Sequence, residues 1–155
     1  MKIRIPLFAL ICAVTALPVV RAQDAQKQMP AKEDQTELGA RMEKMGAAFR
    51  KLRALVKDPT KNADSLAQVA ILKENATEAL KFDPKKKMII PAGDQAKWIS
   101  DYQAKLKTVI GHIDQLEAAL KAGKNDEAEA LYTTIGNEQK EGHTEYKNMP
   151  KKKAP

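Results

Sequence analysis

The chain has 155 residues and a formal net charge of +7, with 27 lysines and arginines against 20 aspartates and glutamates, and it contains one cysteine. It has only three phenylalanines and three tyrosines, and its lysines alternate with glutamates on helical faces, so it lacks the basic stripe and aromatic platform of a nucleic-acid binder. A single cysteine also excludes an intramolecular disulfide and a site built from several thiolates.

The first residues have the pattern of an export signal. Lys2 and Arg4 precede an uncharged apolar run, and residues 20–22 offer small side chains at the usual cleavage spacing. The run is too short for a membrane anchor, and Cys12 lies inside it without a lipid-attachment motif. We therefore predict a signal peptide over residues 1–22 and a periplasmic product without a membrane anchor. Cleavage removes three basic residues and no acidic ones, which lowers the net charge from +7 to +4.

The first two helices are predicted from apolar residues that recur at spacings of three and four. They follow a polar segment, residues 23–33, which is predicted to be a disordered leader. The first helix is expected to begin at Asp34, which would form a capping-box-like pair with Glu37, and to end just before Pro59. The second is expected to begin at Ser65, which has a glutamine three residues further on, and to end near residue 81.

The last two helices follow a connection rich in proline and lysine. The third is predicted to begin at Asp94 and to end at Gly123, and the fourth to run from Asn125 to about Asn148. No strand pattern competes with this interpretation. The predicted fold is an all-α, antiparallel up-down-up-down four-helix bundle over residues 34–148, followed by a basic tail at 149–155.

The inward faces of the first and fourth helices carry the candidate functional residues. His143 lies on the apolar stripe of the fourth helix, where a histidine is by default hydrogen-bonded to an acceptor in the core. Met42 and Met45 lie on the stripe of the first helix, where methionine is by default a gap-filling residue. Because the first and fourth helices of such a bundle are antiparallel neighbours, the methionines and the histidine are predicted at the same end.

A thioether facing an imidazole is the axial pair that low-spin haem proteins use for electron transfer, so Met42 and His143 are the predicted iron ligands. The chain has no CxxCH motif, which excludes covalent attachment of the haem. Gly39 and Gly46 lie one turn either side of Met42, and Gly142 precedes His143. Glycines there would let a flat ring approach the backbone, but they would equally let two helices pack tightly, and both interpretations remain open.

Three segments of the chain resemble matching parts of the soluble periplasmic cytochrome b562 family: residues 41–45 (RMEKM), 109–114 (VIGHID) and 142–146 (GHTEY). The likeness covers about residues 38–147. It implies one non-covalent b-type haem whose axial methionine and histidine fall on Met42 and His143. It also implies that Tyr102 and Leu106 line the haem. The family has aromatic side chains at this wall of the site, so the wall is only partly kept here, with leucine at position 106.

Four further residues near these motifs are assigned roles. Met45 is expected to pack against the ring as a wall residue. Lys140 and Lys147 lie one turn either side of His143, where they would either pair with haem propionates or be ordinary surface lysines. His112 falls beside the apolar stripe of the third helix and is predicted to be a solvated surface residue.

These residues favour a one-electron carrier over an enzyme. Two protein ligands leave the iron no open position, and no acid–base or nucleophile constellation lines the predicted core. The expected partners are redox proteins whose identity the sequence does not specify, and the protein is expected to be a monomer. The alternative is a haem-free periplasmic bundle that binds partner proteins or acts as a stress-related chaperone.

Overall fold

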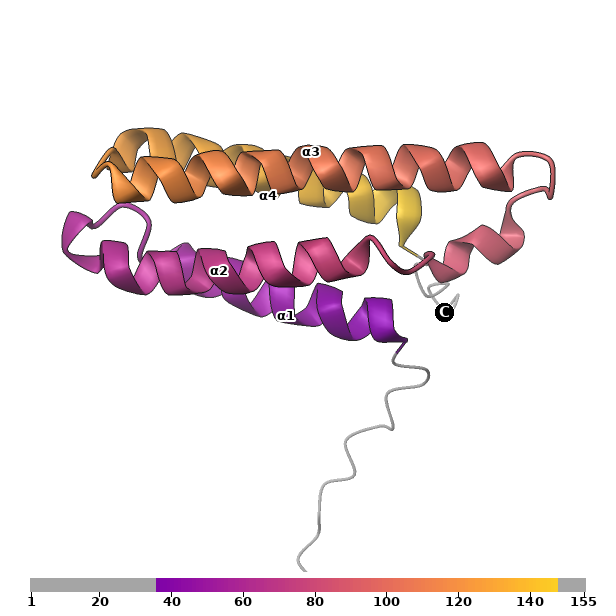
Figure 1. Ribbon diagram of the computed structural model, residues 1–155, viewed down its shortest axis with the longest axis horizontal. Coiled ribbons are helices and arrows are strands. Elements are labelled where there is room, and N and C mark those ends of the chain that lie inside the picture. The colour runs from indigo at the N-terminus through magenta and orange to yellow at the C-terminus, as the bar shows by residue number, and fades with distance from the viewer. Residues whose placement is uncertain (1–35, 148–155) are drawn as a thin grey trace, which may run out of the picture. The chain divides into compact units, whose positions relative to one another are not determined.

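The structure is a computed structural model that describes residues 36–147, so the predicted signal peptide, leader and tail lie outside the described part. The described chain forms four α-helices and two short 3-10 helices, in the order α1 (Glu37–Leu52), η1 (Pro59–Lys61), α2 (Asn62–Ala79), η2 (Lys85–Ile89), α3 (Gln95–Lys121) and α4 (Asn125–Tyr146). Within residues 36–147 no strand occurs, and the predicted all-α bundle is confirmed (Figure 1). No helix in that range is long and apolar enough to cross a bilayer.

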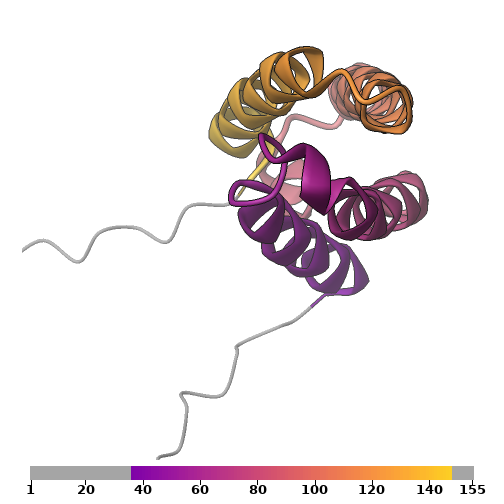
Figure 2. The ribbon, with the colours of Figure 1, turned by 90° about the vertical axis from the view of Figure 1, so that its left-hand side faces the viewer.

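Consecutive helices of the bundle pack closely against each other: α1 against α2, α2 against α3, and α3 against α4. The backbones of α1 and α4 approach each other closely at few points, although the two helices border the same core (Figure 2). We call the end with the α1–α2 and α3–α4 connections the closed end. The other end, where α1 begins, α4 ends and η2 joins α2 to α3, is the open end (Figure 1).

Two of the predicted helix starts are wrong by a few residues. The cap of α1 is Thr36, whose hydroxyl accepts a hydrogen bond from the Gly39 amide at 3.1 Å, and Asp34 lies outside the described residues. Helix α2 begins at Asn62, three residues before the expected Ser65, whose side chain is buried within the first turn. The start of α4 at Asn125 is confirmed.

The predicted end of α3 is confirmed in detail. Gly123 has a φ of 71°, which is the left-handed conformation that glycine adopts without strain. The Lys124 amide donates to the Ala119 carbonyl at 2.9 Å and the Gly123 amide donates to the Leu120 carbonyl at 3.2 Å, the two bonds of a Schellman motif. This motif reverses the chain at once, so α3 and α4 become antiparallel neighbours.

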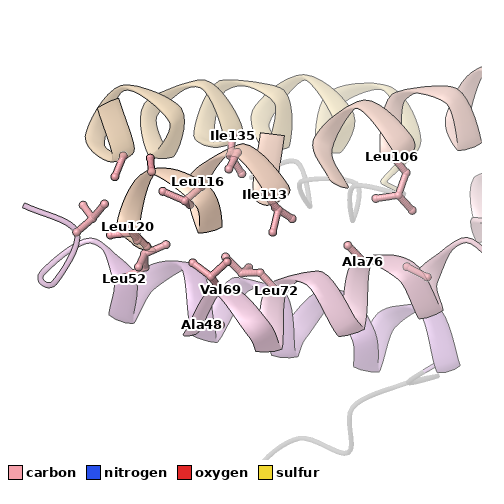
Figure 3. Packing of buried hydrophobic residues seen from close by; sticks show 14 of the residues in the cluster. Ala48, Leu52, Val69, Leu72, Ala76, Leu106, Ile113, Leu116, Leu120 and Ile135 are labelled. Carbon is pink, nitrogen blue, oxygen red and sulfur yellow. The ribbon is translucent and has the colours of Figure 1, made fainter. Parts of the chain in front are cut away.

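The closed end has a dense apolar core. Leu52, Leu116 and Leu120 gather there between the two helix pairs and are almost completely buried (Figure 3). Asn125, only 9% exposed, donates from its side-chain amide to the Val56 carbonyl at 2.9 Å and to the Asn62 side-chain oxygen at 2.8 Å. These bonds join the chain after α1 to the starts of α2 and α4, which fixes this end of the bundle.

Candidate functional site

An aromatic contact shows the register of α1 against α4. Phe49 of α1 stacks on Tyr132 of α4 with ring centroids 4.2 Å apart. Met42 lies seven residues from Phe49 toward the open end, and His143 lies eleven residues from Tyr132 in the same direction. At 1.5 Å per residue these steps are about 10 Å and about 16 Å, so Met42 and His143 lie within about one helical turn of the same level.

His143 is half-buried near the end of α4, and no residue within 36–147 forms a hydrogen bond or ion pair with its ring. The structure therefore gives no acceptor for this ring within the described residues, which is what the simpler interpretation, a core histidine bonded to an acceptor, would require. Burial, and secondly the positive charge of Lys147, hold the pKa of His143 below its usual value of 6.5. The ring is thus neutral near pH 7, and a neutral imidazole has the free lone pair that a metal ligand needs.

The two methionines of α1 are half-buried and pack against the core. Met45 borders a partly open cavity of about 40 Å³, which is lined by residues of all four helices: Met45, Phe49, Leu72, Val109, Ile113, Ile135 and Gln139. Met42 does not line this cavity, and it lies one turn nearer the open end. Met45 therefore faces the middle of the bundle, while Met42 is placed nearer the level of His143.

The glycines argue against one of the two interpretations left open by the sequence, that of tight helix packing. A Cβ at Gly142 would meet no atom within 4 Å, and at Gly39 and Gly46 it would meet only side chains of α1 or its cap. None of these three glycines lets another helix approach. The tight helix contact is at Gly136, where a Cβ would lie 3.3 Å from the Phe49 ring of α1. Backbone therefore remains accessible around Met42 and His143, as a flat ring requires.

The α3 side of the open end is an aromatic wall. Tyr102 and Leu106 are 5% and 7% exposed and belong to the core, so both expected wall residues are buried at this end. The Tyr146 ring packs against Trp98 at 5.0 Å and Tyr102 at 5.2 Å between centroids. Trp98 was not among the candidate functional residues predicted from the sequence, because its contact with Tyr146 depends on how α3 and α4 are turned toward each other.

The Tyr102 hydroxyl is a buried polar group at this end. No hydrogen-bond partner for it occurs within the described chain. Burial, with a smaller contribution from the negative charge of Asp83, raises the pKa of Tyr102 to about 12. The hydroxyl therefore stays protonated and can donate a hydrogen bond to an acceptor that enters the open end.

Charged side chains surround the last turn of α4. Lys105 of α3 pairs with the Glu145 carboxylate and lies 5.8 Å from the centre of the Tyr146 ring. Lys86 of η2 donates from its ammonium group to the Glu145 carbonyl at 2.6 Å, which caps the end of α4. Lys147 is exposed and forms no ion pair within the described residues, so its pairing with a propionate stays a prediction.

His112 corrects another sequence prediction. Its side chain is 26% exposed rather than solvated, and its Nδ1 atom lies 2.9 Å from a carboxylate oxygen of Glu138 on α4. The pair spans α3 and α4 away from the open end. Because it satisfies the imidazole, His112 is a structural residue here and does not compete with His143 as a ligand.

Comparison with known proteins gives one match. The family model described as cytochrome b562 matches residues 37–147, which is nearly the whole described bundle and most of the chain. No curated protein and no solved structure matches the chain significantly.

Proposed function

The chain belongs to the cytochrome b562 family, a family of haem-binding electron carriers, and from this we propose that it is a periplasmic one-electron carrier with a single non-covalent b-type haem. Met42 and His143 would be the axial ligands. The observation that carries this proposal is the half-buried imidazole of His143, which has no partner in the described chain and lies within about one helical turn of the level of Met42, beside accessible backbone.

The haem supplies the redox chemistry, since its iron takes up and releases one electron. The protein's part is to hold and shield it. His143 would hold the ring from α4 and Met42 from α1, while the apolar surfaces of Tyr102, Leu106 and Met45 would exclude water from it. Lys147 would offer its positive charge to a propionate at the open end. With Met42 and His143 both holding the iron, the carrier would need no substrate of its own, and we propose that it acts as a monomer.

A haem titration of the mature chain, residues 23–155, tests this proposal. We expect a six-coordinate, low-spin spectrum in both redox states, because Met42 and His143 together satisfy the iron. Absorption and electron paramagnetic resonance spectra would be recorded at saturating haem. Sharp low-spin bands in the reduced protein are the expected result, and their absence would favour the haem-free, partner-binding bundle instead.

Two substitutions at α1 identify the sulfur ligand. Met42→Ala should remove the axial thioether and give a five-coordinate or water-ligated ferric haem. Met45→Leu should keep the low-spin spectrum and change affinity only slightly, because it conserves side-chain volume beside the cavity. A high-spin haem spectrum in Met45→Leu, but not in Met42→Ala, would assign the sulfur ligand to Met45, one turn away from Met42. His143→Ala should remove low-spin ligation in either case.

A further inference from the structure

The connection between α2 and α3 carries the most exposed large apolar side chains in the described part of the protein. Met88 is 85% exposed and Ile89 is 69% exposed, while the next such residue, Ile71 on α2, is 37% exposed. Three consecutive lysines, Lys85 to Lys87, precede them in the same 3-10 helix. We call these five residues, 85–89, the η2 patch. Adjacent apolar side chains exposed beside clustered charge are a common mark of an interaction site.

The η2 patch has a defined conformation. The Lys87 amide donates to the Pro84 carbonyl and the Ile90 amide donates to the Lys87 carbonyl, each at 3.0 Å. The Gln95 side-chain amide of α3 donates a hydrogen bond to the Ile90 carbonyl at 3.0 Å, and Lys87 forms an ion pair with Asp83. Met88 and Ile89 therefore lie exposed on a turn that hydrogen bonds and an ion pair hold in one conformation. A partner would bind them at little cost in conformational entropy.

The patch is also joined to the proposed haem site. Lys86 donates to the carbonyls of Thr144 and Glu145, the two residues that follow His143 in α4. A protein bound on the η2 patch would thus sit at the end of the bundle where Met42 and His143 lie (Figure 1). A lipid surface bound there would neither give nor take an electron.

We infer that the η2 patch is the docking surface for the carrier's redox partner, a protein that presents acidic side chains around a small apolar centre. This inference rests on the proposed electron-carrier function. The lysines would attract the acidic rim over a distance and orient the encounter, and Met88 and Ile89 would form the contact at its centre. Two apolar side chains make a small interface, which suits a complex that must dissociate after each electron.

Matched variants at the two ends of the bundle test the charge part of this inference. Lys85→Glu with Lys87→Glu changes the net charge as much as Lys57→Glu with Lys61→Glu in the α1–α2 connection at the closed end. Lys57 also pairs with a carboxylate, that of Glu129, as Lys87 does with Asp83. Reduced plant-type [2Fe–2S] ferredoxin, an acidic one-electron protein, serves as the probe, and stopped-flow absorption measures the rate constant for haem reduction.

At low ionic strength the η2 double variant should react on the order of tenfold more slowly than wild type, with a flatter salt dependence, while the closed-end variant stays within about twofold. Ile89→Ser should slow the reaction several-fold, whereas Ile71→Ser should leave it unchanged. Photoreduced lumiflavin, a small neutral reductant, should reduce all variants at the wild-type rate. Equal slowing in both double variants would show that only net charge matters and would overturn the docking surface.

A haem-free measurement separates this inference from the proposed function. Ferredoxin added to ¹⁵N-labelled apoprotein should shift or broaden amide signals of residues 84–91, and the η2 double variant should lose this response. The result does not depend on haem, so failed haem binding beside these shifts would overturn the carrier function and leave the η2 patch as a protein-binding surface without a redox role. Unchanged signals beside a normal low-spin spectrum would overturn the docking surface alone. A lipid surface is tested with phosphatidylglycerol vesicles. If the protein binds them, Ile89→Ser abolishes this binding and the ferredoxin rates are unaffected, the patch binds lipid and the inference is overturned.

Discussion

The two ends of the bundle are built from the same four helices but differ in how closely their segments are joined. At the closed end the large side chains of Leu52 and Leu120 are buried, and Asn125 uses its amide to bond two other segments. At the open end the His143 ring and the Tyr102 hydroxyl have no partners within residues 36–147. The buried Ser65 hydroxyl near the closed end also lacks a partner within the described residues, so the contrast lies in the cross-linking by Asn125. It indicates that the closed end holds the fold together, and that the open end is freer to receive something else.

The largest expected effect is the loss of stability when the closed end is disturbed. Leu52→Ala removes most of a side chain that is 0% exposed, so it should lower the free energy of unfolding by about 2–5 kcal/mol in haem-free protein. His143→Ala at the open end should change it by less than about 1 kcal/mol, because no hydrogen bond of the ring is lost. Urea unfolding followed by circular dichroism measures both. Similar losses in the two variants would break the comparison between the ends.

Haem should change the stability of the protein through the open end alone. A ligand that binds only the folded state adds about 2.7 kcal/mol to the free energy of unfolding at a free concentration 100 times its Kd. Thermal melts with and without haem should therefore differ clearly in wild type, and not in His143→Ala at the same haem concentration. Identical midpoints in the wild-type protein would mean that the open end holds no native haem site.

The closed end and the helix pattern were the parts most accessible from the sequence. Apolar residues at spacings of three and four located the inward faces that include Leu52, Ile113 and Leu120, and these are now buried. The stop at Gly123 was also predictable, because a local motif with one left-handed residue determines it. Such features depend on residues close together in the chain.

Features that depend on two distant helices were missed. Asn62 begins α2, rather than the local cap candidate Ser65, and its amide bonds across the bundle to Asn125. His112 was assigned to the surface because its pairing with Glu138 depends on the rotation of α3 against α4. At the open end the sequence indicated which residues to examine, while the accessible backbone beside Gly142 was visible only once the structure placed no helix there.

Acid should release haem through His143. Burial lowers the pKa of this ring below 6.5, so the folded protein holds the neutral, ligand-ready form at neutral pH. The unfolded chain binds the proton more readily, so the stabilising contribution is complete above about 6.5 and is lost as pH falls through the folded-state pKa. Below that pKa a proton competes with iron for the ring, and haem affinity should fall about tenfold per pH unit.

Haem titrations at a series of pH values between 4 and 8 would measure this loss. Met42→Ala serves as the control, since its remaining histidine ligand should keep the same acid dependence from a weaker starting affinity. An affinity that stays constant to about pH 4 would show that His143 does not ligate the iron.

The smallest expected effect is the sharpest comparison, because one substitution is made twice in the same helix. Gly142→Ala lies at the open end, where its Cβ meets nothing within 4 Å, so better helix propensity should stabilise the haem-free protein by about 0.5–1 kcal/mol. Gly136→Ala lies against Phe49 at 3.3 Å, and Phe49 is held by its stack on Tyr132. Little or none of the gain should remain there, because the Phe49 ring must shift. Urea unfolding of both variants measures these changes in stability.

Haem binding should rank the two variants in the opposite order. Gly142→Ala places a methyl group beside His143 and should weaken haem binding several-fold, whereas Gly136→Ala should leave haem affinity nearly unchanged. If Gly142→Ala gains stability and binds haem as tightly as wild type, the ring does not approach α4 at Gly142, and the accessible backbone there has another cause.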